Sequence, residues 1–132
     1  MKQSVLVRIS LLLMAVTTLM SFRKQDGLEA VLSALKAGNA AALIQRSEDN
    51  LELILPDQSG VVTKAQAQTQ IAKFFAANAV KGFELKHKGN SPGGSYAIGT
   101  LKTQNGDYRV NVFLRGKGSK ELLRELRIQT MD

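Results

Sequence analysis

The sequence predicts a single α+β domain in which N-terminal helices pack on a curved antiparallel sheet. Two observations support this fold class. Capped amphipathic helix patterns fall between residues 26 and 78, and four strand patterns divided by turn clusters fill residues 82–130. Helices that are segregated along the chain from an antiparallel sheet are typical of α+β domains. A length of 132 residues suits one domain that buries its own core.

Residues 1–22 are interpreted as a signal peptide, so the folded domain is expected to span residues 26–130. Lys2 and Arg8 form a positive N-terminal region, and residues 9–20 (ISLLLMAVTTLM) form an uncharged apolar run. This run is shorter than the ~20 apolar residues of a membrane-spanning helix. Ser21 is the best small residue for cleavage, although the A-x-A motif is missing. We expect export to the periplasm or cell envelope; an uncleaved membrane anchor and a buried core helix stay open.

Composition excludes several classes of site. The chain has no cysteine, which rules out disulfides, thiol chemistry and zinc bound through sulfur, and no cofactor is expected. Of the net charge of +7, Lys2 and Arg8 account for two, which leaves about +5 on the mature part. Because export and scattered basic residues argue against nucleic acid, we expect a moderately basic solvated surface. Weak attraction to anionic lipid or polysaccharide is the alternative.

Two helices are predicted at the start of the domain. Asp26 and Glu29 have the spacing of a capping box. Gly38 is expected to end the first helix, and Asn39 can cap a second over residues 40–45. The buried face of the first helix is expected to comprise Leu28, Val31, Leu32 and Leu35.

A strand, a turn and a longer helix are expected next. Residues 51–55 alternate as a strand, residues 56–60 form a turn, and residues 61–62 can begin a returning strand. Thr63 and Gln66 form a capping box for a helix that ends near Asn78. Its buried face is expected to comprise Ala67, Ile71, Phe74 and Phe75.

The closing strands are expected to form a meander with turns at residues 91–94, 105–107 and 116–120. Gly99 inside the second strand indicates a bend or bulge. Alternation predicts these inward residues: Phe83, Leu85, His87, Tyr108, Val110, Val112, Leu114, Leu122, Leu126 and Ile128. They include no carboxylate.

A helical hairpin, a strand, a capped helix and a bent meander together resemble the nuclear-transport-factor-2-like, or cystatin-like, cone fold. Short segments over about residues 26–130 also resemble a family of small exported bacterial proteins that is classed as a domain of unknown function. These segments are residues 63–67 (TKAQA), 74–75 (FF), 87–89 (HKG), 96–101 (YAIGTL), 108–110 (YRV) and 126–128 (LRI). The resemblance implies a fold and a compartment only, because the family has no established activity. The wider fold group contains isomerases, dehydratases, cyclases and binding modules, so the fold selects no chemistry. Enzymes of this fold usually place an Asp or Glu inside the cone as a base, so the resemblance implies that the lack of an inward carboxylate counts against isomerase or dehydratase chemistry.

Two charged or titratable residues are candidates for a pocket inside the cone. His87 shares the predicted apolar face with Phe83 and could act as an acid or base. The alternative is a histidine near a strand end that backbone or solvent satisfies. Arg124 has the parity of Leu122 and Leu126, so an inward guanidinium could hold an anionic ligand. The alternative is a late strand start or a bulge that turns Arg124 outward.

Tyr108 and Phe75 complete the candidate pocket. Tyr108 could present its hydroxyl to the cone interior, or belong to the core with an exposed tip. Phe75 lies on the predicted buried face of the long helix. No catalytic residue and no metal ligand is assigned.

The function expected from these residues is that of a non-catalytic ligand-binding or protein-binding module of the cell envelope. Its partner would be a small apolar or anionic ligand or an envelope protein, and contact with a membrane would run only through an uncleaved signal. The alternative is a small cone-fold enzyme, an isomerase, cyclase or hydrolase, that uses His87. A third hypothesis is a homodimer through the open face of the sheet.

Overall fold

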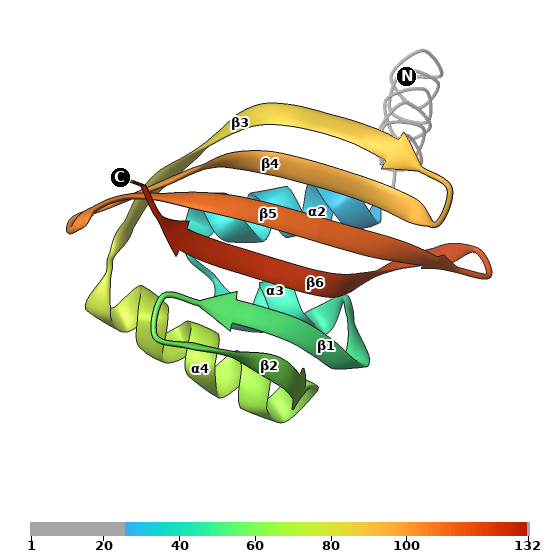
Figure 1. Cartoon of the computed structure of the whole chain (residues 1–132), viewed down its shortest axis with the longest axis horizontal. Coiled ribbons are helices and arrows are strands. Elements are labelled where there is room, and N and C mark those ends of the chain that lie inside the picture. The colour runs from blue at the N-terminus through green and yellow to red at the C-terminus, as the bar shows by residue number, and fades with distance from the viewer. Residues whose placement is uncertain (1–25, 132) are drawn as a thin grey trace, which may run out of the picture.

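The computed structural model describes residues 26–131, which form three helices on one face of a six-stranded sheet (Figure 1). The predicted signal peptide lies outside the described residues. The helices are α2 (Gly27–Ala37), α3 (Ala40–Gln45) and α4 (Lys64–Ala77). The strands are β1 (Ser47–Leu55), β2 (Gln58–Thr63), β3 (Val80–Ser91), β4 (Gly94–Thr103), β5 (Gly106–Lys117) and β6 (Lys120–Thr130).

The helix boundaries follow from capping side chains, as predicted. Asp26 accepts a hydrogen bond from the backbone N–H of Glu29 at 2.8 Å, and Gly38 ends α2 in the left-handed region with φ 63°. Asn39 caps α3 by accepting from the Ala42 N–H at 3.1 Å. These caps place two helices in a tight bend across the sheet. Among the described residues, no helix combines the length and the apolar character needed to cross a membrane.

The capping box at the start of α4 is complete. The Thr63 hydroxyl accepts from the Gln66 N–H at 3.2 Å, and the Gln66 side chain accepts from the Thr63 N–H at 3.1 Å. The helix ends at Ala77, and the N–H of Asn78 donates to the Phe74 carbonyl. The helix therefore begins and ends where the sequence predicts.

The strand order is β2-β1-β6-β5-β4-β3. Neighbouring strands are antiparallel except for β1 and β6, which pair in parallel. The meander of β3 to β6 is as predicted, and β1–β2 is a hairpin whose strands are longer than the alternation of residues 51–55 indicated. The sequence did not indicate that β6 would join this hairpin to the meander. The predicted α+β fold is confirmed.

The interior of the cone is filled with side chains. Residues from all three helices and from β1, β4, β5 and β6 form one buried apolar cluster. The largest fully buried side chains are Leu35, Leu43, Leu51, Leu53, Ile71, Leu101, Leu114, Leu123, Leu126, Ile128, Val31 and Val110. In Figure 1 the sheet lies in front of α2 and α3, so its other face, which we call the open face, turns toward the viewer.

The register of the meander shifts at three places, one of them between Val80 and Gly82 at the start of β3, and the other two are β-bulges beside the candidate residues. In β3, Leu85 pairs with Gly99 but His87 pairs with Ile98, so Lys86 is an additional residue. In β6, Glu125 pairs with Phe113 but Leu123 pairs with Leu114, so Arg124 is additional. Each bulge moves the residues on one side of it to the opposite face from the one that strict alternation predicts.

Candidate functional site

The strongest candidate site is a groove on the open face, which no helix among residues 26–131 covers. The groove crosses β4, β5 and β6 and has a volume of about 270 Å³. Its lining includes the side chains of Tyr96, Ile98, Asn111, Phe113, Glu125 and Arg127. Residues that pair across strands share a face, so these side chains meet in two adjacent rows. The rows are Tyr96–Phe113–Glu125 and Ile98–Asn111–Arg127, and we call the site the open-face groove.

The polar end of the open-face groove contains an ion pair and two buried polar atoms without a partner. Arg127 Nη2 donates to Glu125 Oε1 at 3.1 Å. Arg127 Nε and Asn111 Oδ1 are buried, and neither has a hydrogen-bond partner among the described residues. A buried polar group that stays unpaired costs about 1–3 kcal/mol. One donor and one acceptor beside the groove are therefore unpaired, and neither atom is exposed to solvent.

The aromatic end of the open-face groove is held by contacts with β3. Tyr96 pairs with Gly89, and a Cβ atom at Gly89 would lie 2.8 Å from the Tyr96 hydroxyl, so the phenol covers the glycine. The hydroxyl also lies 3.1 Å from His87 Nε2, with the two ring centroids 5.6 Å apart. Glycine at position 89 thus leaves space for the tyrosine to lie across the neighbouring strand.

His87 lies on the open face at the edge of the groove, and the prediction that it shares the face of Phe83 was wrong. The bulge at Lys86 inserts one residue between Leu85 and His87, which reverses the alternation. Phe83 packs against the core, whereas His87 is exposed and contacts Tyr96. The imidazole therefore does not reach the interior of the cone.

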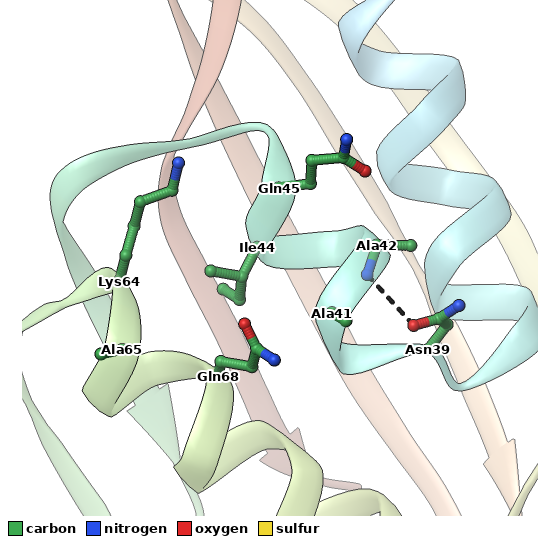
Figure 2. Close-up of a pocket in the computed structure, with 8 residues that line it drawn as sticks. All are labelled: Asn39, Ala41, Ala42, Ile44, Gln45, Lys64, Ala65 and Gln68. Carbon is green, nitrogen blue, oxygen red and sulfur yellow. Dashed lines mark hydrogen bonds between the residues drawn. The ribbon is translucent and has the colours of Figure 1, made fainter.

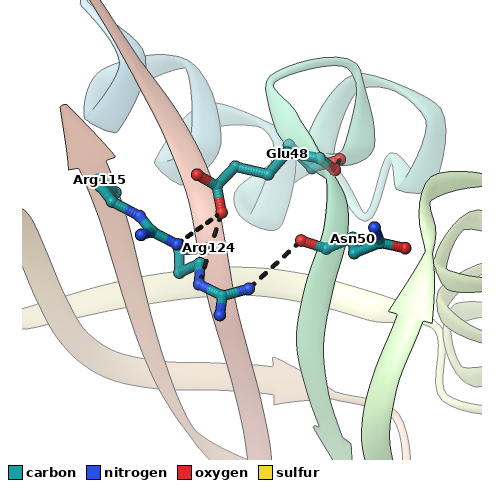
Figure 3. Close-up of polar contacts among 5 residues, drawn as sticks. Glu48, Asn50, Arg115 and Arg124 are labelled. Atoms are coloured by element: carbon teal, nitrogen blue, oxygen red, sulfur yellow. Dashed lines mark hydrogen bonds and ion pairs between the residues drawn. The ribbon is translucent and has the colours of Figure 1, made fainter. Parts of the chain in front are cut away.

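Arg124 also points away from the cone, as the alternative with a bulge predicted. Its Nε lies 3.5 Å from Glu48 Oε2, and its Nη1 donates to the Asn50 carbonyl at 3.4 Å. Arg115 Nη2 contacts the same Glu48 oxygen at 3.1 Å (Figure 3). The Glu48 side chain is 9% exposed, so two guanidinium groups pair with one almost buried carboxylate. Arg124 is therefore engaged in joining β1, β5 and β6.

Tyr108 and Phe75 lie between α4 and the sheet. The Tyr108 hydroxyl donates to Asn78 Oδ1 at 3.1 Å, and its ring packs edge-on against Phe74 with centroids 5.1 Å apart. Phe75 belongs to the buried apolar cluster. Both side chains serve packing, and the four predicted pocket residues do not meet in one place.

Other hollows among the described residues also open at the surface. One lies between α3 and α4 and is lined mainly by alanine and glutamine side chains, with Lys64 at its edge (Figure 2). Others lie beside the β1–β2 turn, around Glu48, and beneath the β5–β6 hairpin. The residues of the described core that are 0% exposed line none of these five sites.

Electrostatics and metal-binding potential add little to the site. The described residues contain no group of three or more histidine or acidic residues placed to hold a metal ion. Hydrogen bonding to Lys86, followed by the charges of Lys86 and Lys102, lowers the pKa of the Glu84 carboxyl below its ordinary value. This side chain is about half exposed on β3, outside the groove. The groove therefore offers no evident acid–base pair among the described residues.

The residues of the open-face groove were missed because alternation places them on the outward face. Asn111 and Arg127 alternate with the apolar positions that were assigned to the core. Tyr96, Ile98 and Phe113 supplied a usable signal, since three large apolar side chains recur at outward positions of two neighbouring strands. Their combination into one groove depends on strand register, which the sequence did not specify.

Comparison with known proteins places the chain in a family. Residues 28–129 match the model of a domain of unknown function, DUF4783. A DUF4783 family protein from Bacteroides ovatus is 34% identical, with a TM-score of 0.74 over 78% of this chain and 94% of that one. A DUF4783 family protein from Bacteroides uniformis is 33% identical, with a TM-score of 0.77 over 81% and 99%. The match fills nearly all of these crystallised chains, so in these two relatives a domain of this extent is folded without further chain.

More distant structures support the fold but not an activity. An NTF2-like protein of unknown function from Cytophaga hutchinsonii is 11% identical, with a TM-score of 0.58 over 81% of this chain and 92% of that one. No protein of curated function matches the sequence. The chain belongs to the DUF4783 family and has the α+β cone of NTF2-like and cystatin-fold proteins.

Proposed function

We propose that this protein is a non-catalytic binding module of the cell envelope, and that it binds its partner on the open face of the sheet. The observation that carries the proposal is the open-face groove, where Tyr96, Ile98 and Phe113 lie beside unpaired polar atoms of Asn111 and Arg127. Apolar walls with a few convergent polar groups are typical of ligand sites. The location in the envelope rests on the apolar run of residues 9–20.

Because side chains fill the interior of the cone, the open face is better suited than the interior to serve as the binding surface. Tyr108 and Phe75 pack between α4 and the sheet, and the core side chains around them are almost completely buried. A ligand in the interior would have to displace these side chains, and close-packed interiors resist such insertion.

The enzymatic alternative depends on His87 and is less well supported. A catalytic histidine requires a group that orients its ring, usually a carboxylate. The hydrogen-bond partner of His87 is the Tyr96 phenol, and the ring is exposed at the edge of the groove. Turnover of a defined substrate by the purified protein, abolished by His87→Ala, would contradict the binding proposal.

NMR with the isotope-labelled domain of residues 26–132 tests the proposed surface. We expect ligands from a small set of apolar, acidic and amide compounds to shift the amide signals of Ile98, Asn111 and Phe113. Ile98→Glu should abolish these shifts because it places a charge in the apolar part of the groove. Val61→Glu is the matched control, since Val61 is 66% exposed on β2, outside the groove. Shifts that map to the core or to the helices instead would overturn the proposal.

A homodimer through the open face is the second candidate. Glu125 and Arg127 lie side by side there, so a two-fold axis could bring the carboxylate of each copy to the guanidinium of the other. The groove's apolar side chains would become the centre of such an interface. Light scattering tests this candidate: it predicts a dimer mass that Ile98→Glu converts to a monomer mass, and a monomer at all concentrations excludes it.

A further inference from the structure

A hollow around Glu48, beside the β5–β6 hairpin, gathers charged side chains from three strands. It has a volume of about 340 Å³ and opens at the surface, and we call it the Glu48 hollow. Its lining residues are Glu48, Asp49, Asn50, Arg115, Lys117 and Arg124. None of them lines the open-face groove, so the two sites are independent.

The carboxylate of Glu48 is already engaged by two arginines. Arg115 Nη2 and Arg124 Nε lie 3.1 and 3.5 Å from the same oxygen of Glu48, and the two side chains come from neighbouring strands (Figure 3). Because the Glu48 side chain is only 9% exposed, a ligand in the hollow meets the guanidinium groups and not the carboxylate. One negative charge also faces two positive ones, which leaves positive charge in excess.

Both guanidinium groups keep N–H donors that solvent can reach. The side chain of Arg115 is 47% exposed, and that of Arg124 is 37% exposed. Arg115 contacts Glu48 through Nη2, whereas Arg124 uses Nε and Nη1, so the other N–H groups of each remain for a ligand. These donors lie in a fixed planar fork, which matches the oxygens of an oxyanion.

Two lysines at the end of the hairpin add positive charge. Lys117 and Lys120 lie opposite each other on β5 and β6, and residues paired in this way share a face of the sheet. The ion pairs within residues 26–131 include neither lysine. Like charges directly opposite each other destabilise a strand pair, and a bound anion would relieve this repulsion. Asp49 is the exposed carboxylate at the hollow and offsets one of the charges.

We propose that the Glu48 hollow binds an oxyanion with two negative charges, such as a sulfate or phosphate group. The two arginines and two lysines outnumber Glu48 and Asp49, so an excess of two positive charges remains. Arg115 and Arg124 supply hydrogen bonds, and Lys117 supplies charge from the same face. A dianion gains more than a monoanion here, because Coulomb attraction grows with the charge of the ligand.

NMR titration tests the site in the domain of residues 26–132, about the extent that is folded in the two Bacteroides relatives. Sodium sulfate or sodium acetate replaces sodium chloride at constant ionic strength, so that general screening stays equal. We expect saturable shifts of the amide signals of Arg115, Lys117 and Arg124 and of the two arginine Nε–H signals. Sulfate should bind about tenfold more tightly than acetate.

Arg124→Gln is the decisive variant, because it removes one charged donor from the hollow. It should weaken sulfate binding about tenfold, the effect of one charge-assisted hydrogen bond. Lys117→Gln is the second variant, and it should weaken binding by roughly two- to fivefold through the lost charge. Lys81→Gln is the matched control, since it removes the same charge from an exposed position on β3 and should leave the affinity unchanged. The dispersion of the amide spectrum checks the fold of each variant.

Three outcomes overturn the inference. Shifts that rise without saturation show general ionic attraction only. An equal loss of affinity in Lys81→Gln and Arg124→Gln shows that the net charge of the protein acts, and not the hollow. Acetate that binds as tightly as sulfate contradicts the preference for a dianion. None of these results affects the proposal for the open-face groove, because the two sites share no lining residue.

A comparison of inorganic phosphate with phenyl phosphate distinguishes two sources of the anion. Phe113 and Arg115 lie two residues apart on β5 and therefore share a face, so a phenyl group on the anion can extend toward the open-face groove. Tighter binding of phenyl phosphate supports the inference with the oxyanion as part of a larger molecule. Equal or weaker binding supports it with a free anion as the ligand. Absence of saturable shifts with both phosphates overturns it.

Discussion

At the scale of single residues, glycines decide how closely the strands and their side chains approach. The sequence predicted a bend at Gly99, and the bulge of β3 lies directly opposite, between Leu85 and His87. The structure adds a reason that alternation could not supply, because the ring of Phe83 lies against Gly99. A Cβ atom there would also lie 2.6 Å from the Glu84 carbonyl oxygen. Contacts of this kind depend on the neighbouring strand and are not encoded locally.

Gly99→Ala should therefore destabilise the fold. The added methyl collides with the ring of Phe83 and with backbone, and overpacking of this kind costs about 1–3 kcal/mol. Gly82→Ala is the matched control in β3, because a Cβ at Gly82 meets nothing within 4 Å. Urea denaturation of both variants measures the free energy of unfolding. Equal stability of the two variants would contradict the packing described at Gly99.

At the scale of elements, the helices and turns were predictable from the sequence. The face of the sheet to which strand side chains point was not predictable at and beyond the bulges. Capping residues such as Asp26 and Thr63 act over three residues, so their signals are local and survive in the sequence. A β-bulge inserts one residue without a comparable composition signal. His87 and Arg124 were both assigned inward by alternation, and both lie next to or within a bulge. The predicted pocket lost these two residues for this reason, although its strands are correct.

Substitution of two neighbouring leucines tests the bulge in β6. Alternation assigned Leu122 to the core, whereas the structure places Leu123 there with 0% exposure. Leu123→Ala should cost about 2–5 kcal/mol through the lost contacts and the cavity, and Leu122→Ala should cost clearly less. Thermal or urea unfolding measures both. The reverse order of stabilities would show that β6 follows strict alternation without a bulge.

At the scale of the whole molecule, the cone shape was predictable from the sequence, but whether the cone encloses a cavity was not. Helices before a meander indicate a cone, and the family comparison agrees. Whether a cone encloses a cavity depends on the sizes of side chains that meet from distant parts of the chain, such as Leu51, Leu101 and Ile128. The sequence also did not indicate the parallel pairing of β1 with β6. Parallel strands are connected by a long crossover and not by a tight turn, so no local turn signal marks their pairing.

A chain that ends at Gly118 should not fold. It lacks β6, which lies between β1 and β5, so the β1–β2 hairpin would lose its place beside the meander. It would also lose the fully buried side chains of Leu123, Leu126 and Ile128. Circular dichroism and amide-proton exchange should show an unfolded chain, whereas a chain that ends at Thr130 should fold. Cooperative unfolding of the shorter chain would contradict the central role of β6.

The central position of β6 has a consequence for how the protein is made. Because synthesis proceeds from the N-terminus, the last strand to leave the ribosome is the one that joins the two parts of the sheet. Contacts between the start and the end of a chain carry a high contact order, which slows folding. The domain is thus expected to stay incomplete until β6 has been synthesised, so that the two parts of the sheet are joined last.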